Sequence, residues 1–130
     1  MVFSLEGEAA IPAAEPPVVP IPIAAPDFVV DEALAARGQG AFVQCGYCHG
    51  AYGAVAGGLA PDLRASPMVL SEAAFLEAVR GGGLRARGMP AFESLTDSDA
   101  NAIRHFIRQQ AELGLAAEQL RSGAMGGQSR

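Results

Sequence analysis

The feature of this 130-residue sequence that most limits what the chain can fold into is the run Cys45-Gly46-Tyr47-Cys48-His49. The chain contains no cysteine besides these two. Two cysteines cannot staple a whole fold, and a bridge between residues this close adds little to stability. The two thiols are therefore expected to act in local chemistry, together with the histidine that follows them.

A C-x-x-C-H string is an attachment sequence for haem of the c type. Two thiols on one helical turn, Cys45 and Cys48, can form thioethers with two vinyl groups on one porphyrin edge, which places the His49 imidazole over the iron. Three alternatives compete with this interpretation. A redox dithiol needs a strand and helix pattern that does not surround these residues, a zinc site needs ligands that His105 alone cannot supply, and the spacing could arise by chance.

A candidate second axial ligand lies in Gly88-Met89-Pro90, inside a glycine-rich stretch. The thioether of Met89 is a soft, neutral donor that suits ferrous iron and raises the reduction potential relative to harder donors. Methionine more often fills a core, but the attachment string upstream favours ligation by His49 and Met89. The weaker candidates are Met68, the near-terminal Met1 and Met125, and His105, which is expected to be an ordinary surface residue.

The charge is concentrated at the N-terminus. Residues 1–32 hold six acidic residues and no basic one, and the remainder is close to neutral. The sequence therefore lacks the basic field that nucleic-acid binding requires, and it has no apolar stretch long enough to cross a bilayer. Tryptophan is absent and aromatic residues are few, so a buried prosthetic group would supply apolar bulk.

Six of the nine prolines fall within residues 9–26. Proline fixes φ, removes a backbone donor and favours extended polyproline conformation. Residues 1–30 are therefore expected to form a stiff leader that lies along a neighbouring surface rather than packing into its own domain. The first ten residues lack the pattern of a secretion signal, although Phe3 and Leu5 could belong to a short strand.

Three helices are expected after the leader. The first begins at Asp31 and ends as the chain reaches Cys45, and the glycine within it, Gly38, indicates that another backbone passes close by. Its apolar face comprises Leu34, Ala35, Gly38, Phe42 and Val43. Residues 50–70 are expected to be loop.

The second helix is expected to be capped by Ser71, to bury Phe75 and Val79, and to close at the glycines 81–83. The third begins near Thr96, with Asp99 at the capping-box position, and ends near Gly114. Its buried stripe comprises Ala102, Ile103, Phe106 and Ile107. Residues 115–130 are expected to continue briefly as helix and then to become a glycine-rich, flexible tail.

This order of helix, C-G-Y-C-H, A-P-D-L, G-M-P loop and terminal helix resembles a class I cytochrome c over residues 31–113. The resemblance implies an all-α fold of three main helices around one covalently bound haem c, with the domain at 31–114. It implies that Pro61 offers its carbonyl to the Nδ1 proton of His49, and that Gly38 and Phe106 mark the crossing of the first and last helices.

The closer resemblance is to the C-terminal haem domain of PQQ-dependent quinohaemoprotein alcohol dehydrogenases. It rests on Cys48-His49-Gly50, the run from Ala60 to Arg64, the run from Gly88 to Phe92 and the proline-rich leader, with residues 2–5 resembling a last propeller strand. It implies a monomeric periplasmic domain, with no export signal in this chain, that is not an enzyme by itself. It implies a donor domain holding PQQ and calcium, and a blue-copper protein, a cytochrome or a quinone as the acceptor.

The arginines near these motifs have candidate roles. Arg64 is expected to pair with a haem propionate, while Arg80, Arg85 and Arg87 are expected to be solvated or to form a docking surface. Two other functions stay open: a free-standing diffusible periplasmic cytochrome, and a haem enzyme or gas sensor such as a peroxidase module, which needs an open sixth site.

Overall fold

The computed structural model describes residues 19–54 and 60–126, and these residues contain helices and no strand. The all-α fold expected from the sequence is confirmed. Among the described residues, no helix combines the length and apolarity that crossing a bilayer requires. The elements are α1 (Glu32–Ala41), α2 (Val43–His49), the 3-10 turns η1 (Leu63–Ala65) and η2 (Pro67–Leu70), α3 (Glu72–Leu76), the π-helical η3 (Glu77–Gly81), the 3-10 turn η4 (Arg85–Arg87) and α4 (Asp97–Gly126).

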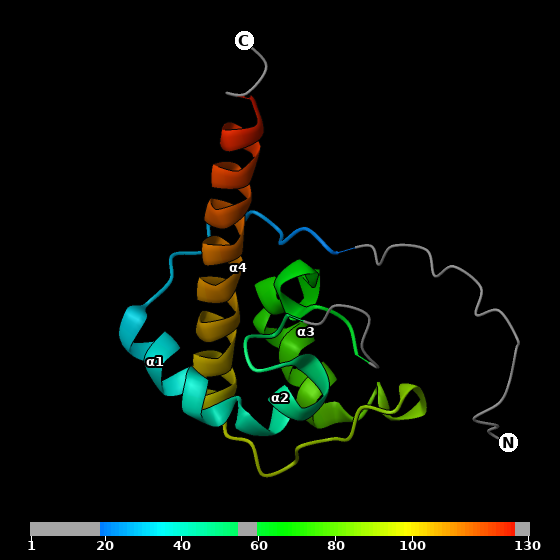
Figure 1. Ribbon diagram of the computed structural model, residues 1–130. Coiled ribbons are helices and arrows are strands. Elements are labelled where there is room, and N and C mark those ends of the chain that lie inside the picture. Colours follow the sequence, from blue (N-terminus) through cyan, green and yellow to red (C-terminus); the bar gives the residue numbers. More distant parts are fainter. Residues whose placement is uncertain (1–18, 55–59, 127–130) are drawn as a thin grey trace, which may run out of the picture.

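The long helix α4 forms the axis of the domain, and α1 crosses it on one side (Figure 1). A Cβ placed on Gly38 would lie 2.0 Å from the backbone oxygen of Ala102, so the two helices meet backbone to backbone at this point. One turn further along, the rings of Phe42 and Phe106 pack with centroids 5.2 Å apart. The crossing expected at Gly38 and Phe106 is confirmed.

The core lies between these two helices and the α3 region. Phe75 and Val79, expected to share a face, are both buried, and they join residues of α4 in one apolar cluster. The cluster comprises Phe42, Val69, Phe75, Val79, Ala100, Ile103, Phe106 and Ile107.

The three expected helix starts are confirmed by side-chain caps. The Asp31 carboxylate accepts from the Leu34 amide at 2.9 Å, and the Ser71 hydroxyl accepts from the Ala74 amide at 3.3 Å. At α4, the Thr96 hydroxyl accepts from the amide of Asp99 at 3.1 Å and donates to its carboxylate. Each cap satisfies an amide that has no partner within its helix.

Two expected helix ends are wrong. Helical structure does not stop at Cys45, because α2 continues past Phe42 to His49 and carries both cysteines. The change of direction at Phe42 turns Val43 outward, to 61% exposure, so Val43 is not part of the buried face.

The expected end of the third helix near Gly114 is also wrong, because α4 continues through this residue to Gly126. This glycine is explained by a contact rather than by a terminus. A Cβ on Gly114 would lie 3.0 Å from Pro22 and 3.2 Å from the guanidinium of Arg64. The helix keeps glycine here because two other segments press against it.

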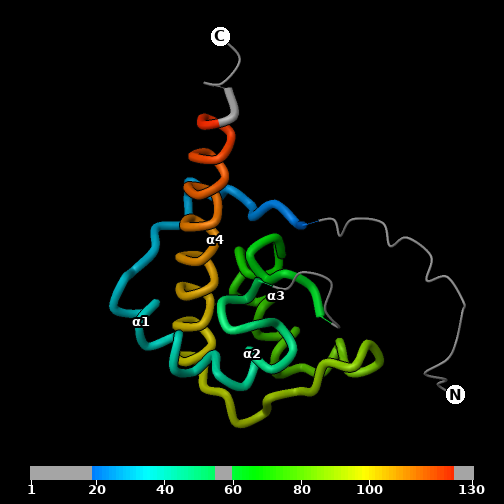
Figure 2. The backbone as a smooth tube through the Cα atoms, in the orientation of Figure 1, coloured from blue at the N-terminus to red at the C-terminus, as the bar shows by residue number. Residues whose placement is uncertain are grey.

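The leader also differs from expectation where the structure describes it, at residues 19–30. These residues pack on their own domain, with the Ile23 amide donating to the Arg64 carbonyl at 3.0 Å and the Ile23 carbonyl accepting from Arg108 at 2.8 Å. Figure 2 shows this blue segment running past α4. The strand-like run at residues 2–5 lies outside the described residues.

Candidate functional site

The two cysteines and His49 lie together on α2. Because Cys45 and Cys48 are three residues apart on a helix, they project from the same face. Cys45 is half-buried against the apolar cluster and Cys48 is exposed. Burial, and to a smaller extent the neighbouring Cys48 thiol, raises the pKa of Cys45. The turn therefore presents two thiols at the edge of the core, one facing inward and one facing solvent.

His49 ends α2 with its side chain buried, and its ring is held by one hydrogen bond. Nδ1 of His49 lies 2.9 Å from the carbonyl oxygen of Pro61, the contact that the resemblance implies. A carbonyl oxygen can only accept, so the proton is on Nδ1 and the lone pair is on Nε2. This is the tautomer that binds a metal through Nε2, with the second ring nitrogen anchored as in other ligating histidines.

The segment carrying Pro61 is fixed by its neighbours. The amide of Leu63 donates to the carbonyl of Gly53 at 2.8 Å, which ties the segment to the chain that follows α2. The buried carboxylate of Asp62 accepts from the amide of Arg64 at 2.9 Å and from its guanidinium at 2.7 and 3.1 Å. The Pro61 carbonyl therefore belongs to a short rigid turn.

Sequence reasoning did not find this role of Asp62. The signal was present, since an aspartate directly before a short helical turn, with an arginine two residues later, is a pattern for a local cap. The structure also gives the Arg64 guanidinium a protein carboxylate as its partner. Pairing of Arg64 with a haem propionate stays a prediction.

Met89 lies after η4, half-buried against the same apolar cluster as Cys45. Gly88 precedes it with a φ of 90°, a left-handed conformation that favours glycine, and the amide of Met89 donates to the carbonyl of Leu84. A surface pocket opens here, lined by Arg85, Gly88, Met89, Pro90 and Ala91. Cys45 of α2 and Met89 thus both pack against the same apolar cluster.

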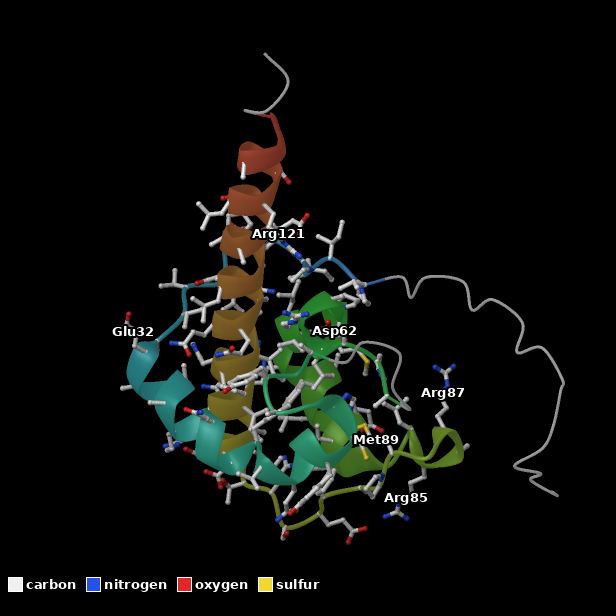
Figure 3. All side chains as sticks on the ribbon, in the orientation of Figure 1. Glu32, Asp62, Arg85, Arg87, Met89 and Arg121 are labelled. Carbon is white, nitrogen blue, oxygen red and sulfur yellow. The ribbon has the colours of Figure 1, made fainter. Side chains whose placement is uncertain are left out.

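The three arginines before Met89 do not form one free positive surface. Arg80 donates to the carbonyl of Leu95 and pairs with Asp97, and Arg85 pairs with Glu93 at 2.9 Å. In Figure 3, Arg85 and Arg87 point away from the helices in different directions. The charge of Arg80 and Arg85 is therefore partly balanced by neighbouring carboxylates.

His105 lies on α4 and contacts residues that precede α1. Its Nδ1 accepts from the amide of Asp31 at 3.0 Å, and its ring packs on Phe28 with centroids 5.0 Å apart. Burial lowers the pKa of His105, Asp31 opposes this shift and Arg104 adds to it. The other weak candidate, Met68, lies in η2 at 36% exposure.

The residues present fit haem c better than a bare metal ion. Within the described ranges, three or more His, Cys, Asp or Glu side chains do not gather anywhere in an arrangement that could hold a metal. Two thiols on one helical turn are instead the groups that attach a haem covalently, and a ring nitrogen and a thioether are suitable ligands for its iron.

Comparison with known proteins gives matches over most of the chain. Residues 33–107 match the family described as cytochrome C oxidase, cbb3-type, subunit III. The chain is 34% identical over 113 residues to quinohemoprotein alcohol dehydrogenase ADH IIB of Pseudomonas putida, covering 82% of this chain and 16% of that protein. It is also 34% identical over 117 residues to the dehydrogenase subunit of the alcohol dehydrogenase (quinone) of Gluconobacter oxydans, covering 85% of this chain and 14% of that protein. The chain therefore spans less than a fifth of the length of these relatives.

Proposed function

The chain belongs to the cytochrome c family represented by cbb3-type oxidase subunit III, and from this we propose that it is an electron-transfer domain holding one haem c. The family itself implies the haem. The single observation that carries the proposal is the hydrogen bond from His49 Nδ1 to the Pro61 carbonyl. It leaves the lone pair of Nε2 available to bind a metal, next to the attachment string.

The proposed roles of the residues follow from their places in the fold. Cys45 and Cys48 hold the porphyrin through thioethers, so the cofactor stays attached in both oxidation states. His49 and Met89 would hold the iron, and the rigid turn at Pro61 keeps the imidazole oriented. When bound, haem iron supplies the ability to take up and release one electron.

A closed ligand set suits electron transfer rather than substrate chemistry. Met89 is anchored by its backbone bond to Leu84 and by packing against the core, so its thioether would be held in place as a ligand of the iron. Two protein ligands that do not exchange keep the geometry similar in both oxidation states. They also keep small molecules off the metal, which distinguishes this function from that of a peroxidase module or gas sensor.

We also propose that the electron donor is a dehydrogenase domain carrying PQQ and calcium, and that the domain works in the bacterial periplasm as a monomer. The names of the two relatives and the small share of each that this chain covers support a larger dehydrogenase partner. The proposed acceptor is a blue-copper protein, another cytochrome or a quinone. In this scheme the chain relays electrons and carries out no substrate reaction by itself.

Replacing Met89 tests the ligand assignment. In Met89→Ala we expect loss of the sulfur-to-iron charge-transfer band, a large fall in reduction potential and binding of carbon monoxide by the reduced protein. Met68→Ala is the matched control, since Met68 is partly exposed in η2, and it should keep the wild-type spectrum. An unchanged spectrum in Met89→Ala, or carbon monoxide binding by the wild type, would contradict the proposal.

Reduction by a donor tests the relay. The oxidised domain is mixed with a PQQ-loaded quinohaemoprotein dehydrogenase lacking its own haem domain, together with an alcohol, and the absorbance of the reduced haem is followed. We expect reduction that depends on the alcohol. If the haem is reduced equally fast without alcohol, or not at all, the dehydrogenase is not its donor.

A further inference from the structure

Ile23 in the leader joins two parts of the domain through its backbone. Its amide donates to the carbonyl of Arg64 in η1 at 3.0 Å, and its carbonyl accepts from the guanidinium of Arg108 on α4 at 2.8 Å. Arg108 is 2% exposed and Ile23 is half-buried, so this contact is partly shielded from solvent. Both polar groups of a single leader residue are thus bonded to the folded domain.

The residue that accepts from Ile23 belongs to the rigid turn that holds the iron ligand. Arg64 is bonded through its amide and its guanidinium to the carboxylate of Asp62, whose side chain is 1% exposed. Asp62 directly follows Pro61, whose carbonyl lies 2.9 Å from His49. Residues 61–64 are therefore linked to one another and to His49 by these bonds.

The seating of the leader on this unit is tight. A Cβ on Gly114 would lie 3.0 Å from Pro22 and 3.2 Å from Arg64, so the leader, η1 and α4 meet closely at this glycine. On the opposite side the unit is held by the bond from the Leu63 amide to Gly53. The segment that carries the Pro61 carbonyl is thus held at Leu63 by Gly53 and at Arg64 by Ile23 of the leader.

We propose that Ile23 is a positioning residue for His49: its backbone bonds seat residues 61–64, and this seating sets the hydrogen bond between Pro61 and His49. The inference rests on the proposed function, in which His49 binds haem iron. A partner of the second ring nitrogen tunes the electron density of a ligating imidazole. The reduction potential of the haem is therefore coupled to whether the leader is docked.

Three variants of the haem-loaded full chain separate the backbone bond from other effects. Ile23→Pro removes the amide donor, while Ile23→Ala keeps the donor and shortens the side chain. Ile21→Pro is the matched control, because Ile21 lies in the same proline-rich segment and is 69% exposed. The measurements are the reduction potential, the NMR signals of the His49 ring and the exchange rates of the amides of Arg64 and Ala65.

In Ile23→Pro we expect a shifted reduction potential, displaced His49 ring signals and exchange at Arg64 about fivefold faster, the factor that a typical net hydrogen-bond contribution gives. Ile23→Ala and Ile21→Pro should match the wild type in all three. A lower melting temperature with an unchanged potential and unchanged His49 signals would show that the leader only stabilises the fold, and would overturn the proposal. Equal shifts in Ile23→Ala would also overturn it, because the amide is intact there.

If Ile23→Pro does not fold, hydrogen exchange in the wild type still tests the proposal. The Ile23 amide should exchange slowly in the folded protein, and exchange at the rate of an unstructured peptide would overturn the proposal. Failure of the proposed function has a different signature. It would appear in the wild type itself, as absence of covalent haem or of the sulfur-to-iron band.

Discussion

Replacing Gly38 by alanine tests how closely α1 and α4 approach. The added Cβ would lie 2.0 Å from the Ala102 carbonyl oxygen and 2.4 Å from its carbon, whereas ordinary contact begins at 3.4 Å. Both atoms are backbone, so no side-chain rotation can relieve the overlap. The two helices must separate by more than 1 Å, on the order of the difference between these distances.

The expected cost follows from the packing around this point. Overpacking of a core costs about 1–3 kcal/mol, and the upper value applies because the separation also loosens the contact of Phe42 with Phe106. Alanine gains about 1 kcal/mol of helix propensity over glycine, which offsets part of this cost. Gly38→Ala should therefore lower the free energy of unfolding by about 2 kcal/mol.

Gly40→Ala is the matched control, because Gly40 lies on the same helix and an added Cβ there meets nothing within 4 Å. It should raise the free energy of unfolding by about 1 kcal/mol, so the two variants should differ by about 3 kcal/mol. Urea unfolding followed by far-ultraviolet circular dichroism and by haem absorbance measures both. If the two variants differ by less than about 0.5 kcal/mol, smaller than the expected spread of surface substitutions, the close approach at Gly38 is refuted.

Three other substitutions have defined outcomes. Asp62→Asn should lower the free energy of unfolding by about 2 kcal/mol, since it weakens hydrogen bonds to a charged partner in a buried turn, and it should shift the reduction potential measured by voltammetry. Thr96→Ala should cost about 1 kcal/mol in urea unfolding through loss of the α4 cap, while Ser94→Ala should have no effect. The pKa of His105 is lowered in the folded state, so below about pH 6.5 the unfolded chain binds the proton more readily and stability is lost as the pH falls towards the folded pKa. His105→Gln should flatten this dependence between about pH 5 and 7, and an unchanged pH profile would contradict it.

The parts of the fold that sequence reasoning found are those set by neighbours in the chain. Asp31, Ser71 and Thr96 each cap an amide three residues away, and such bonds depend on local residue types alone. The attachment string and the loop around Met89 are also local patterns. Gly38 was informative because a glycine inside a helix is costly unless a close contact requires it.

The parts that sequence reasoning missed depend on residues far apart in the chain. Gly114 suggested a helix end, but in the structure Pro22 packs against it where a side chain would lie. Pro22 is more than ninety positions away in the chain. The bond between Ile23 and Arg108 joins residues 85 positions apart and has no signature in either segment. A proline-rich composition predicts an extended backbone, but it does not say on which surface that backbone lies.

Docking of the leader changes how a tethered donor could reach this haem. A free linker ending at residue 30 would add about 37 Å of reach through residues 19–30 alone, at about 3.1 Å per residue in extended conformation. Because Ile23 is instead bonded to η1 and α4, residues 23–30 add no such reach, and under the proposed relay a donor attached through the leader would be held nearer to the domain. The point where the leader leaves the domain is then beside Arg64 and Gly114 rather than beside Asp31. Under the proposed relay, a donor attached through the leader would therefore be tethered on the side of the turn that carries Pro61 and Arg64, which is the side where a change in docking would act on the haem potential.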